Sequence, residues 1–390
     1  MPRYNETCSN YETKKRGEKM KRSIKIFTLG IVALMTIFVL AACNSESGGK
    51  GGAVSVGIVL PTKDEPRWVQ DEERFKAALD DSEYTTEILF SQGSSAKEKE
   101  NVDTLISKGI EVLIIAPHDG AAAGAAVEAA KKEGITVIAY DRLITDTDAV
   151  DYYVTFDSVA VGEAQGQYLI DNASGSGVPL YLYAGAASDN NAFLFFEGAW
   201  KVLQPKIADG TFVIANSSEA EKLKDKSELT RDEMSAILGQ VTTNWDPSES
   251  KNKAETHLTA VSDDLKGDVA ILAPNDGTAR AIADVFSSDP AISSFVVTGQ
   301  DAEKASIQYI IDGKQTMTVF KDVRTLVTDA MGMAIEVLEG NTPETTGSYN
   351  NGEVDVKAKQ TDVIVVNKEN VKSELIDSGY YEADEFTGLE

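Results

Sequence analysis

Polar and charged side chains follow directly after the apolar runs of this 390-residue chain, and their types suggest a shared chemistry. Carboxylates, guanidinium groups and amides each form two hydrogen bonds in a fixed geometry, which suits adjacent hydroxyl groups on one small molecule. Trp68 adds a flat apolar face of the kind that can cover the C–H side of a pyranose ring. These residue types therefore predict a site for a neutral polyol. The side chains are Lys63, Arg67, Trp68, Asp119, Asp141, Arg142, Asp189, Asn190, Asn191, Asn275, Asp276, Gln300, Asp301, Lys321 and Asp322.

The elements that must position these residues can be read from the apolar pattern. Short β-branched runs alternate with segments of helical periodicity, and the runs are apolar on both faces, as in parallel strands covered by helices. We therefore expect an α/β fold. Strands are expected at residues 54–60, 86–90, 112–116, 136–140, 152–155, 180–183, 269–273, 294–298, 316–320 and 362–366. Helices are expected at residues 67–79, 96–108, 121–132, 158–172, 191–203, 248–259, 278–286 and 323–338.

The sequence also repeats itself. Residues 112–120 (VLIIAPHDG) match residues 269–277 (VAILAPNDG), and residues 137–141 match residues 297–301. Such a repeat indicates two similar Rossmann-like domains with parallel sheets. Ligands of open parallel sheets bind beyond the carboxyl ends of the strands, so two facing domains would place the polar residues in one cleft.

The composition excludes several other functions. Asp and Glu total 63 against 37 Lys and Arg, a formal charge of −26, so a nucleic acid or an anionic membrane surface would be repelled. The chain lacks the glycine-rich nucleotide motifs, the H-E-x-x-H and EF-hand motifs and the G-x-S-x-G motif. With two His and two Cys, zinc or Cys–His catalysis is excluded, and we interpret His118 and His257 as structural. We expect no metal and no cofactor.

The first 42 residues differ from the rest, with a net charge of +5 and an uncharged run at 26–42. A basic region, an apolar region and then small residues are typical of a secretory signal, and an uncleaved membrane anchor is the alternative. The end of the run, Leu-Ala-Ala-Cys43, resembles the lipobox of bacterial lipoproteins, which implies a lipid on Cys43 and an extracytoplasmic, membrane-anchored location. Residues 43–52 predict a flexible tether, and either Met1 or Met20 is the initiator.

Segments of the polar set resemble the sugar-binding lipoproteins of bacterial ABC transporters, which have the type I periplasmic binding-protein fold. The similarity runs from residue 54 to about residue 366 and is strongest to the subgroup of xylose-binding and multiple-sugar (glucose/galactose) receptors. The matching segments are Arg67-Trp68, Tyr140-Asp141-Arg142, Asp189-Asn190-Asn191, Ala273-Pro274-Asn275-Asp276, Gly299-Gln300-Asp301-Ala302 and Thr316 to Lys321. The resemblance implies that a monosaccharide contacts Arg67, Trp68, Asp141, Arg142, Asp189, Asn191, Asp276, Asp301 and Lys321.

The resemblance also implies a division into lobes and a set of partners. The N-terminal lobe is expected at 53–156 plus 301–321 and the C-terminal lobe at 157–300 plus 322–390, with a three-segment hinge near residues 156, 301 and 322. Closure of the hinge would bury the sugar, provided that the closed form binds it better than the open form does. An ABC permease with its ATPase is the implied partner, and we expect a monomer without catalytic activity.

Simpler interpretations of the same residues stay open. Asp189 could serve only to cap the helix from Asn191, and Asn275-Asp276 only to cap the helix from Thr278. Asp141 could form a structural ion pair with Arg142. We interpret Trp245 as a residue packed in the core or hinge, with stacking on a ligand as the alternative. Where relatives carry Pro-Glu-Asn after a Trp, this chain continues from Trp245 as Asp-Pro-Ser-Glu, so that contact and the preferred sugar are left open.

Two other functions fit the same architecture. A glycoside hydrolase would need two carboxyl groups about 5 to 9.5 Å apart across a glycosidic bond. The Arg and Asn neighbours of the cleft aspartates would keep these carboxyls ionised and make them poor general acids, which disfavours this function. A sugar-sensing partner of a chemoreceptor or sensor kinase makes the same demands on the sequence as a transport receptor, so it stays open.

Overall fold

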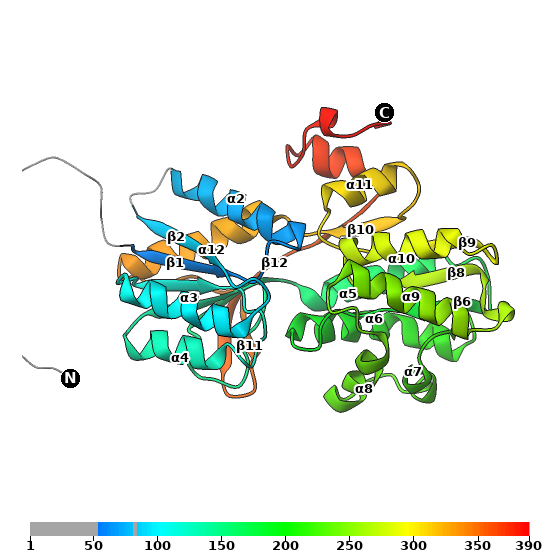
Figure 1. Ribbon diagram of the computed structural model, residues 1–390, viewed down its shortest axis with the longest axis horizontal. Coiled ribbons are helices and arrows are strands. Elements are labelled where there is room, and N and C mark those ends of the chain that lie inside the picture. The colour runs from blue at the N-terminus through cyan, green and yellow to red at the C-terminus, as the bar shows by residue number, and fades with distance from the viewer. Residues whose placement is uncertain (1–53, 81–83, 390) are drawn as a thin grey trace, which may run out of the picture. The chain divides into compact units, whose positions relative to one another are not determined.

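The structure is a computed structural model that describes residues 54–80 and 84–389. The expected signal, the tether and Cys43 lie outside the described residues. Within the described part, no helix is long and apolar enough to cross a membrane. The described residues form two lobes, each with its own sheet (Figure 1).

The N-terminal lobe contains a seven-stranded sheet in the order β11-β12-β5-β4-β3-β1-β2. All neighbouring strands are parallel except β11, which is antiparallel to β12. The strands are β1 (Val56–Leu60), β2 (Thr86–Phe90), β3 (Val112–Ile115), β4 (Thr136–Tyr140), β5 (Tyr152–Phe156), β11 (Gly347–Asn350) and β12 (Asp355–Thr361). The helices of this lobe are α2 (Pro66–Asp80), α3 (Ser95–Ser107), α4 (Gly124–Lys132) and α12 (Val323–Leu338). One apolar cluster fills each face of the sheet, which confirms the expected α/β class.

The C-terminal lobe contains a four-stranded parallel sheet in the order β7-β6-β8-β9 and an antiparallel pair, β10-β13. The strands are β6 (Val178–Leu182), β7 (Phe212–Ile214), β8 (Gly267–Leu272), β9 (Ile292–Val297), β10 (Met317–Phe320) and β13 (Ile364–Asn367). The helices are α5 (Ser158–Asp171), α6 (Asn190–Ala208), α7 (Ser218–Lys222), α8 (Arg231–Val241), α9 (Pro247–Ala260), α10 (Asp276–Ser288) and α11 (Lys304–Ile311). Short helices at Asp263–Leu265, Lys372–Ile376 and Ala383–Glu385 complete the described elements.

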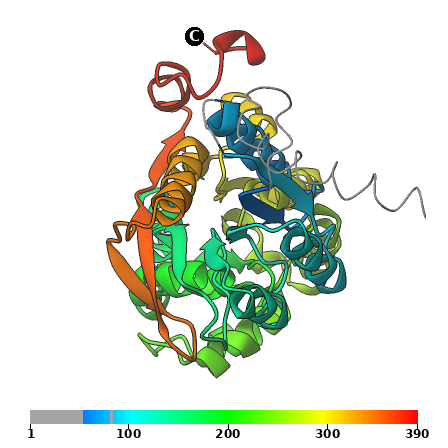
Figure 2. The ribbon, with the colours of Figure 1, turned by 90° about the vertical axis from the view of Figure 1, so that its left-hand side faces the viewer.

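The expected lobe boundaries are wrong after residue 300. Strand β12 pairs with β5 in the N-terminal sheet, and α12 packs against α2, so residues 323–361 belong to the N-terminal lobe (Figures 1 and 2). Conversely, β10 pairs with β13 and is bridged to Gln300, so residues 301–320 belong to the C-terminal lobe. The chain therefore crosses between lobes near residues 157, 321 and 362, and not near residue 301.

Helices α5 and α6 pack backbone to backbone, and this contact positions the start of α6 at the interlobe side. A Cβ atom on Gly162 would lie 1.9 Å from the carbonyl oxygen of Phe195, and one on Gly198 would lie 2.1 Å from that of Val159. Only glycine allows an approach this close. The packing holds the first turns of α6, which carry Asn191 and Phe195, against the rest of the C-terminal lobe.

Candidate functional site

A cavity lies between the two lobes, and eight of the nine predicted site residues line it. The space between its side chains is about 300 Å³, part of it open to solvent. The lining residues are Glu65, Arg67, Trp68, Asp141, Arg142, Asp189, Asn191, Phe195, Trp245, Asn275, Gln300, Asp301 and Lys321. Many of these residues follow the carboxyl ends of strands, as the repeat predicts, whereas Phe195 lies within α6 and Trp245 follows α8. The ninth residue, Asp276, does not line the cavity.

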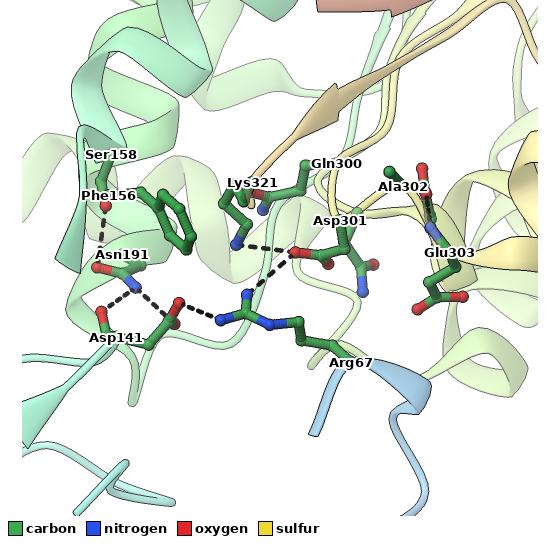
Figure 3. A network of polar contacts seen from close by, with 12 residues as sticks. Arg67, Asp141, Phe156, Ser158, Asn191, Gln300, Asp301, Ala302, Glu303 and Lys321 are labelled. Carbon is green, nitrogen blue, oxygen red and sulfur yellow. Dashed lines mark hydrogen bonds and ion pairs between the residues drawn. The ribbon is translucent and has the colours of Figure 1, made fainter. Parts of the chain in front are cut away.

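Arg67 lies at the centre of the charged network in Figure 3. It is in the first turn of α2, and its guanidinium contacts Asp71 at 2.6 Å, Asp141 at 3.0 Å and Asp301 at 3.5 Å. Burial lowers the pKa of Arg67, but the three carboxylates raise it by more than burial lowers it. The pKa of Arg67 therefore lies well above the ordinary value. The contact with Asp301 joins the N-terminal lobe to the C-terminal lobe.

Asp141 follows β4 and has a positive φ of 62°, a conformation that non-glycine residues adopt at a cost and that is enriched at functional sites. Its carbonyl oxygen accepts hydrogen bonds from the Tyr153 hydroxyl at 2.8 Å and from the Asn191 amide at 2.9 Å. Burial raises the pKa of its carboxyl, but Arg67, Lys321 and Arg142 outweigh burial and lower the pKa. Asp141 is therefore ionised at neutral pH.

Arg142 forms the second interlobe ion pair, with its Nε 3.0 Å from Asp189 Oδ2. Its guanidinium also lies 5.0 Å from the ring centroid of Trp68, within the range of a cation–π contact. The expected alternative, an Asp141–Arg142 ion pair, is wrong, because Asp141 pairs with Arg67 instead.

Asp189 has two roles. Its carboxylate accepts a hydrogen bond from the backbone N–H of Asn191 at 2.9 Å, so the expected cap of helix α6 is confirmed, and the same carboxylate lines the cavity. Burial raises the pKa of Asp189 despite the opposing effect of Arg142. Cationic and amide neighbours therefore outweigh burial and lower the pKa at Asp141, whereas burial outweighs them and raises the pKa at Asp189.

The C-terminal lobe supplies Asp301 and two aromatic walls. Asp301 has a φ of 98°, and its carboxylate lies 2.8 Å from Lys321 Nζ. Phe195 and Trp245 meet edge to face with ring centroids 6.2 Å apart. Trp245 is buried in the core of this lobe, as expected, and it also lines the cavity. Its indole Nε1 and the Oε1 of Gln300 are buried without a hydrogen-bond partner among the described residues.

Sequence reasoning missed Glu65 and Phe195 as cavity residues. Phe195 lies one helical turn after Asn191, and residues four apart share a helix face, so this signal was present in the sequence. Glu65 lies two residues before Arg67 in the loop between β1 and α2, where no periodic pattern points to the cavity.

Asp276 belongs to a separate buried cluster at the start of α10. Its Oδ1 accepts a hydrogen bond from the Gln315 side chain at 2.8 Å, and its Oδ2 accepts one from the backbone N–H of Glu303 at 2.9 Å. Burial, Glu303 and Asp301 raise its pKa well above the ordinary value. Both carboxylate oxygens of Asp276 are thus bonded within the protein, outside the lining of the cavity. The neighbouring Asn275 caps α10 through Thr278 N–H and also lines the cavity.

The two histidines have no place in the cavity. His257 Nδ1 lies 3.0 Å from the Asn216 side chain and 3.3 Å from the Tyr183 hydroxyl, and burial lowers its pKa to about 4. The backbone N–H of His118 donates to the buried Glu98. Among residues 54–80 and 84–389, no group of three or more His, Cys, Asp and Glu side chains is arranged to hold a metal ion.

Comparisons with known proteins agree on one family. Residues 56–342 match the model of the "Periplasmic binding protein domain" family. The multiple sugar-binding periplasmic receptor ChvE of Rhizobium radiobacter is 33% identical over 374 residues, covering 93% of this chain and 99% of that protein. The D-xylose-binding periplasmic protein of Escherichia coli is 31% identical over 332 residues, covering 85% of this chain and 92% of that protein.

Solved structures extend these similarities. A carbohydrate transporter solute binding protein from Chloroflexus aurantiacus, in complex with D-glucose, is 69% identical with a TM-score of 0.85, covering 86% of this chain and 98% of that chain. An ABC transporter solute binding protein from Clostridium phytofermentans with bound β-D-glucose is 32% identical with a TM-score of 0.74, covering 86% and 99% of the two chains.

Proposed function

Because the chain belongs to the periplasmic binding protein family, we propose that it is an extracytoplasmic receptor that binds a monosaccharide between its lobes and delivers it to an ABC permease. D-Glucose is the first ligand to test, since two similar proteins of known structure hold it. The observation that carries the proposal is the cavity itself, where paired charges from both lobes surround buried polar groups without hydrogen-bond partners in residues 54–80 and 84–389.

The chemistry of the cavity suits a neutral polyol. The carboxylates of Asp141, Asp189 and Asp301 accept hydrogen bonds from hydroxyl groups, and the cations donate hydrogen bonds to hydroxyl oxygens. Gln300 Oε1 offers an unused acceptor and Trp245 Nε1 an unused donor. An unpaired buried polar atom costs about 1–3 kcal/mol, so a ligand that supplies the missing partners gains affinity.

Binding is proposed to operate by hinge closure. Three contacts join the lobes across the cavity: Arg67 with Asp301, Arg142 with Asp189, and Asp141 with Asn191. A sugar that bonds to members of all three pairs contacts both lobes only when the lobes are closed. Its preference for the closed form then shifts the equilibrium toward closure.

No covalent step is proposed. A glycosidase needs a protonated carboxyl and an ionised one on opposite sides of a glycosidic bond. In this cavity Asp141, whose pKa is lowered, pairs with Arg67 of its own lobe, and Asp189, whose pKa is raised, pairs with Arg142 across the lobes. Both carboxylates are thus held by cations that surround the ligand space. Release of aryl alcohol from aryl glycosides by the purified protein would contradict this part of the proposal.

A thermal-shift screen followed by titration calorimetry tests the proposed function. The purified protein is heated with D-glucose, D-galactose, D-xylose, L-arabinose or D-ribose, because a ligand that binds only the native state raises its melting temperature. We expect at least one aldose to raise the melting temperature and to bind in a one-to-one ratio by calorimetry. A protein that responds to none of them would contradict the proposal.

The lipid anchor on Cys43 is a separate proposal, since that residue lies outside the described part of the chain. It rests on the lipobox-like sequence Leu-Ala-Ala-Cys43 behind a secretory signal. Labelled palmitate should be incorporated into the protein when it is produced in bacterial cells, and Cys43→Ala should abolish the label. Equal labelling of both forms would exclude this anchor.

A further inference from the structure

Glu65 differs from the other charged residues of the cavity in its position. Its side chain is 21% exposed, whereas those of Arg142 and Asp189 are 6% and 3% exposed. Glu65 therefore lies at the mouth of the cavity. One carboxylate oxygen of Glu65 is 3.6 Å from Arg142 Nη2, whereas Asp189 contacts the same guanidinium at Nε.

With Glu65 included, the lining residues carry four carboxylates and three cations. Every one of these cations already has a carboxylate partner: Arg67 contacts Asp141 and Asp301, Lys321 contacts Asp301, and Arg142 contacts Asp189 and Glu65. A ligand carboxylate would meet no free cation and one carboxylate in excess. Like charges placed together at an interface cost several kcal/mol, whereas a neutral hydroxyl group avoids this repulsion.

We propose that Glu65 is a specificity-determining residue, which selects neutral sugars over uronic acids by occupying Arg142 and adding a carboxylate at the cavity mouth. This inference rests on the proposed function and narrows its substrate class. Glu65 acts on the charge of the ligand, and the recognition of hydroxyl groups is left to the deeper residues Asp141, Asp189 and Asp301.

The surroundings of Glu65 set the conditions of the test. Burial raises its pKa to about 7, with Arg142 acting to lower the pKa and Asp301 and Asp189 to raise it. Trp68 also acts to lower the pKa of Glu65, and its Nε1 has no hydrogen-bond partner in the part of the chain that the structure describes. Titrations at pH 8 keep most of the Glu65 population ionised, so the charge effect is measured in full.

Titration calorimetry with D-glucose and D-glucuronate at pH 8 separates charge selection from direct contact. In the unmodified protein we expect glucuronate to bind at least about 100-fold more weakly than glucose, given several kcal/mol for like charges. In Glu65→Gln, the affinity for glucuronate should rise about tenfold or more, because Arg142 becomes available to the ligand carboxylate. The affinity for glucose should change by less than about threefold. Glu65→Asp keeps the charge and should retain the exclusion. Glu73→Gln removes a charge from an exposed position on α2, the helix that follows Glu65, and should change the affinity for neither sugar.

Each contrary result has a distinct meaning. The role of Glu65 is overturned, with sugar binding left intact, if the unmodified protein binds glucose and glucuronate equally well. It is also overturned if Glu65→Gln does not raise the affinity for glucuronate. A loss of glucose affinity of about tenfold or more in Glu65→Gln makes Glu65 a hydroxyl-binding residue and also overturns the proposal. If no neutral sugar binds the unmodified protein, the proposed function fails as well.

Discussion

Asp141 and Asp276 both follow a strand of a parallel sheet and both are buried, yet the structure gives them opposite surroundings. Asp141 faces the cavity among Arg67, Lys321 and Arg142, and its pKa is lowered. Asp276 is fully buried beside Glu303, and its pKa is raised. Both oxygens of Asp276 already accept hydrogen bonds from the protein. A buried carboxylate at a strand end is therefore a candidate for ligand binding where it lines the cavity and its neighbours are cations.

The largest expected effect is that of Asp141→Asn on sugar affinity. The amide keeps the size of the carboxylate but leaves Arg67 with one fewer negative partner and removes a charged acceptor. Loss of one member of a buried, hydrogen-bonded charge pair costs about 2–5 kcal/mol, so we expect affinity to fall about 100-fold. Titration calorimetry measures the change. Affinity within about threefold of the unmodified protein would remove Asp141 from the site.

A smaller effect is expected when the cavity wall is moved without changing its charge. A Cβ atom on Gly185 would lie 2.0 Å from the Trp245 ring, so Gly185→Ala must displace the indole that lines the cavity. We expect about a tenfold loss of sugar affinity, equivalent to about 1.4 kcal/mol. Gly239→Ala is the control, because its new methyl group meets nothing within 4 Å. Unchanged affinity in Gly185→Ala would show that Trp245 is only part of the core.

The two aspartates should also respond to pH with opposite signs. The pKa of Asp276 is raised on folding. At pH values between the pKa of the unfolded state and that of the folded state, this carboxyl binds more protons in the folded protein. Asp276 therefore makes the protein less stable as pH rises above about 4. Asp141, with a lowered pKa, contributes stability that is lost as pH falls below about 4.

Urea unfolding from pH 5 to 7 measures this difference. Asp276→Asn should flatten the decline in unfolding free energy by up to about 1.4 kcal/mol per pH unit, the limit for one proton. Asp141→Asn should leave the slope in this range unchanged. Identical slopes in Asp276→Asn and the unmodified protein would contradict a raised pKa for Asp276.

The smallest expected effect is that of Asp276→Asn on sugar binding. Because Asp276 contacts Gln315 and the backbone of Glu303 outside the cavity lining, we expect affinity to change by less than about threefold, or about 0.7 kcal/mol. Titration calorimetry compares the sugar affinity of Asp276→Asn with that of Asp141→Asn. A loss as large as that of Asp141→Asn would show that Asp276 reaches the ligand.

Much of the fold could be predicted because buried parallel strands read as apolar runs. Strands β2 and β4 have the expected bounds, and most of the site follows from the rule that ligands lie beyond strand ends. Strand β12 could not be found in this way. Its sequence, Asp-Val-Lys-Ala-Lys-Gln-Thr, has only two apolar residues, each between charged ones, and the lobe boundary was misplaced as a result.

The remaining differences in the site arise from side-chain direction. The repeat places Asp276 at a strand end, but no sequence pattern indicates that Gln315, distant in the chain, occupies its carboxylate. Phe195 belongs to an apolar run in α6 that reads as core. Its place at the cavity depends on the backbone contact of α6 with Gly162 in α5, which only the three-dimensional packing reveals.

A crystal structure of the protein with D-glucose tests the central claim most directly. The account predicts a sugar in the interlobe cavity, with hydroxyl groups about 2.5–3.2 Å from Asp141 and from Arg142 or Asp189, and with Asp276 still bonded to Gln315. A sugar bound through Asp276, or bound outside this cavity, would contradict it.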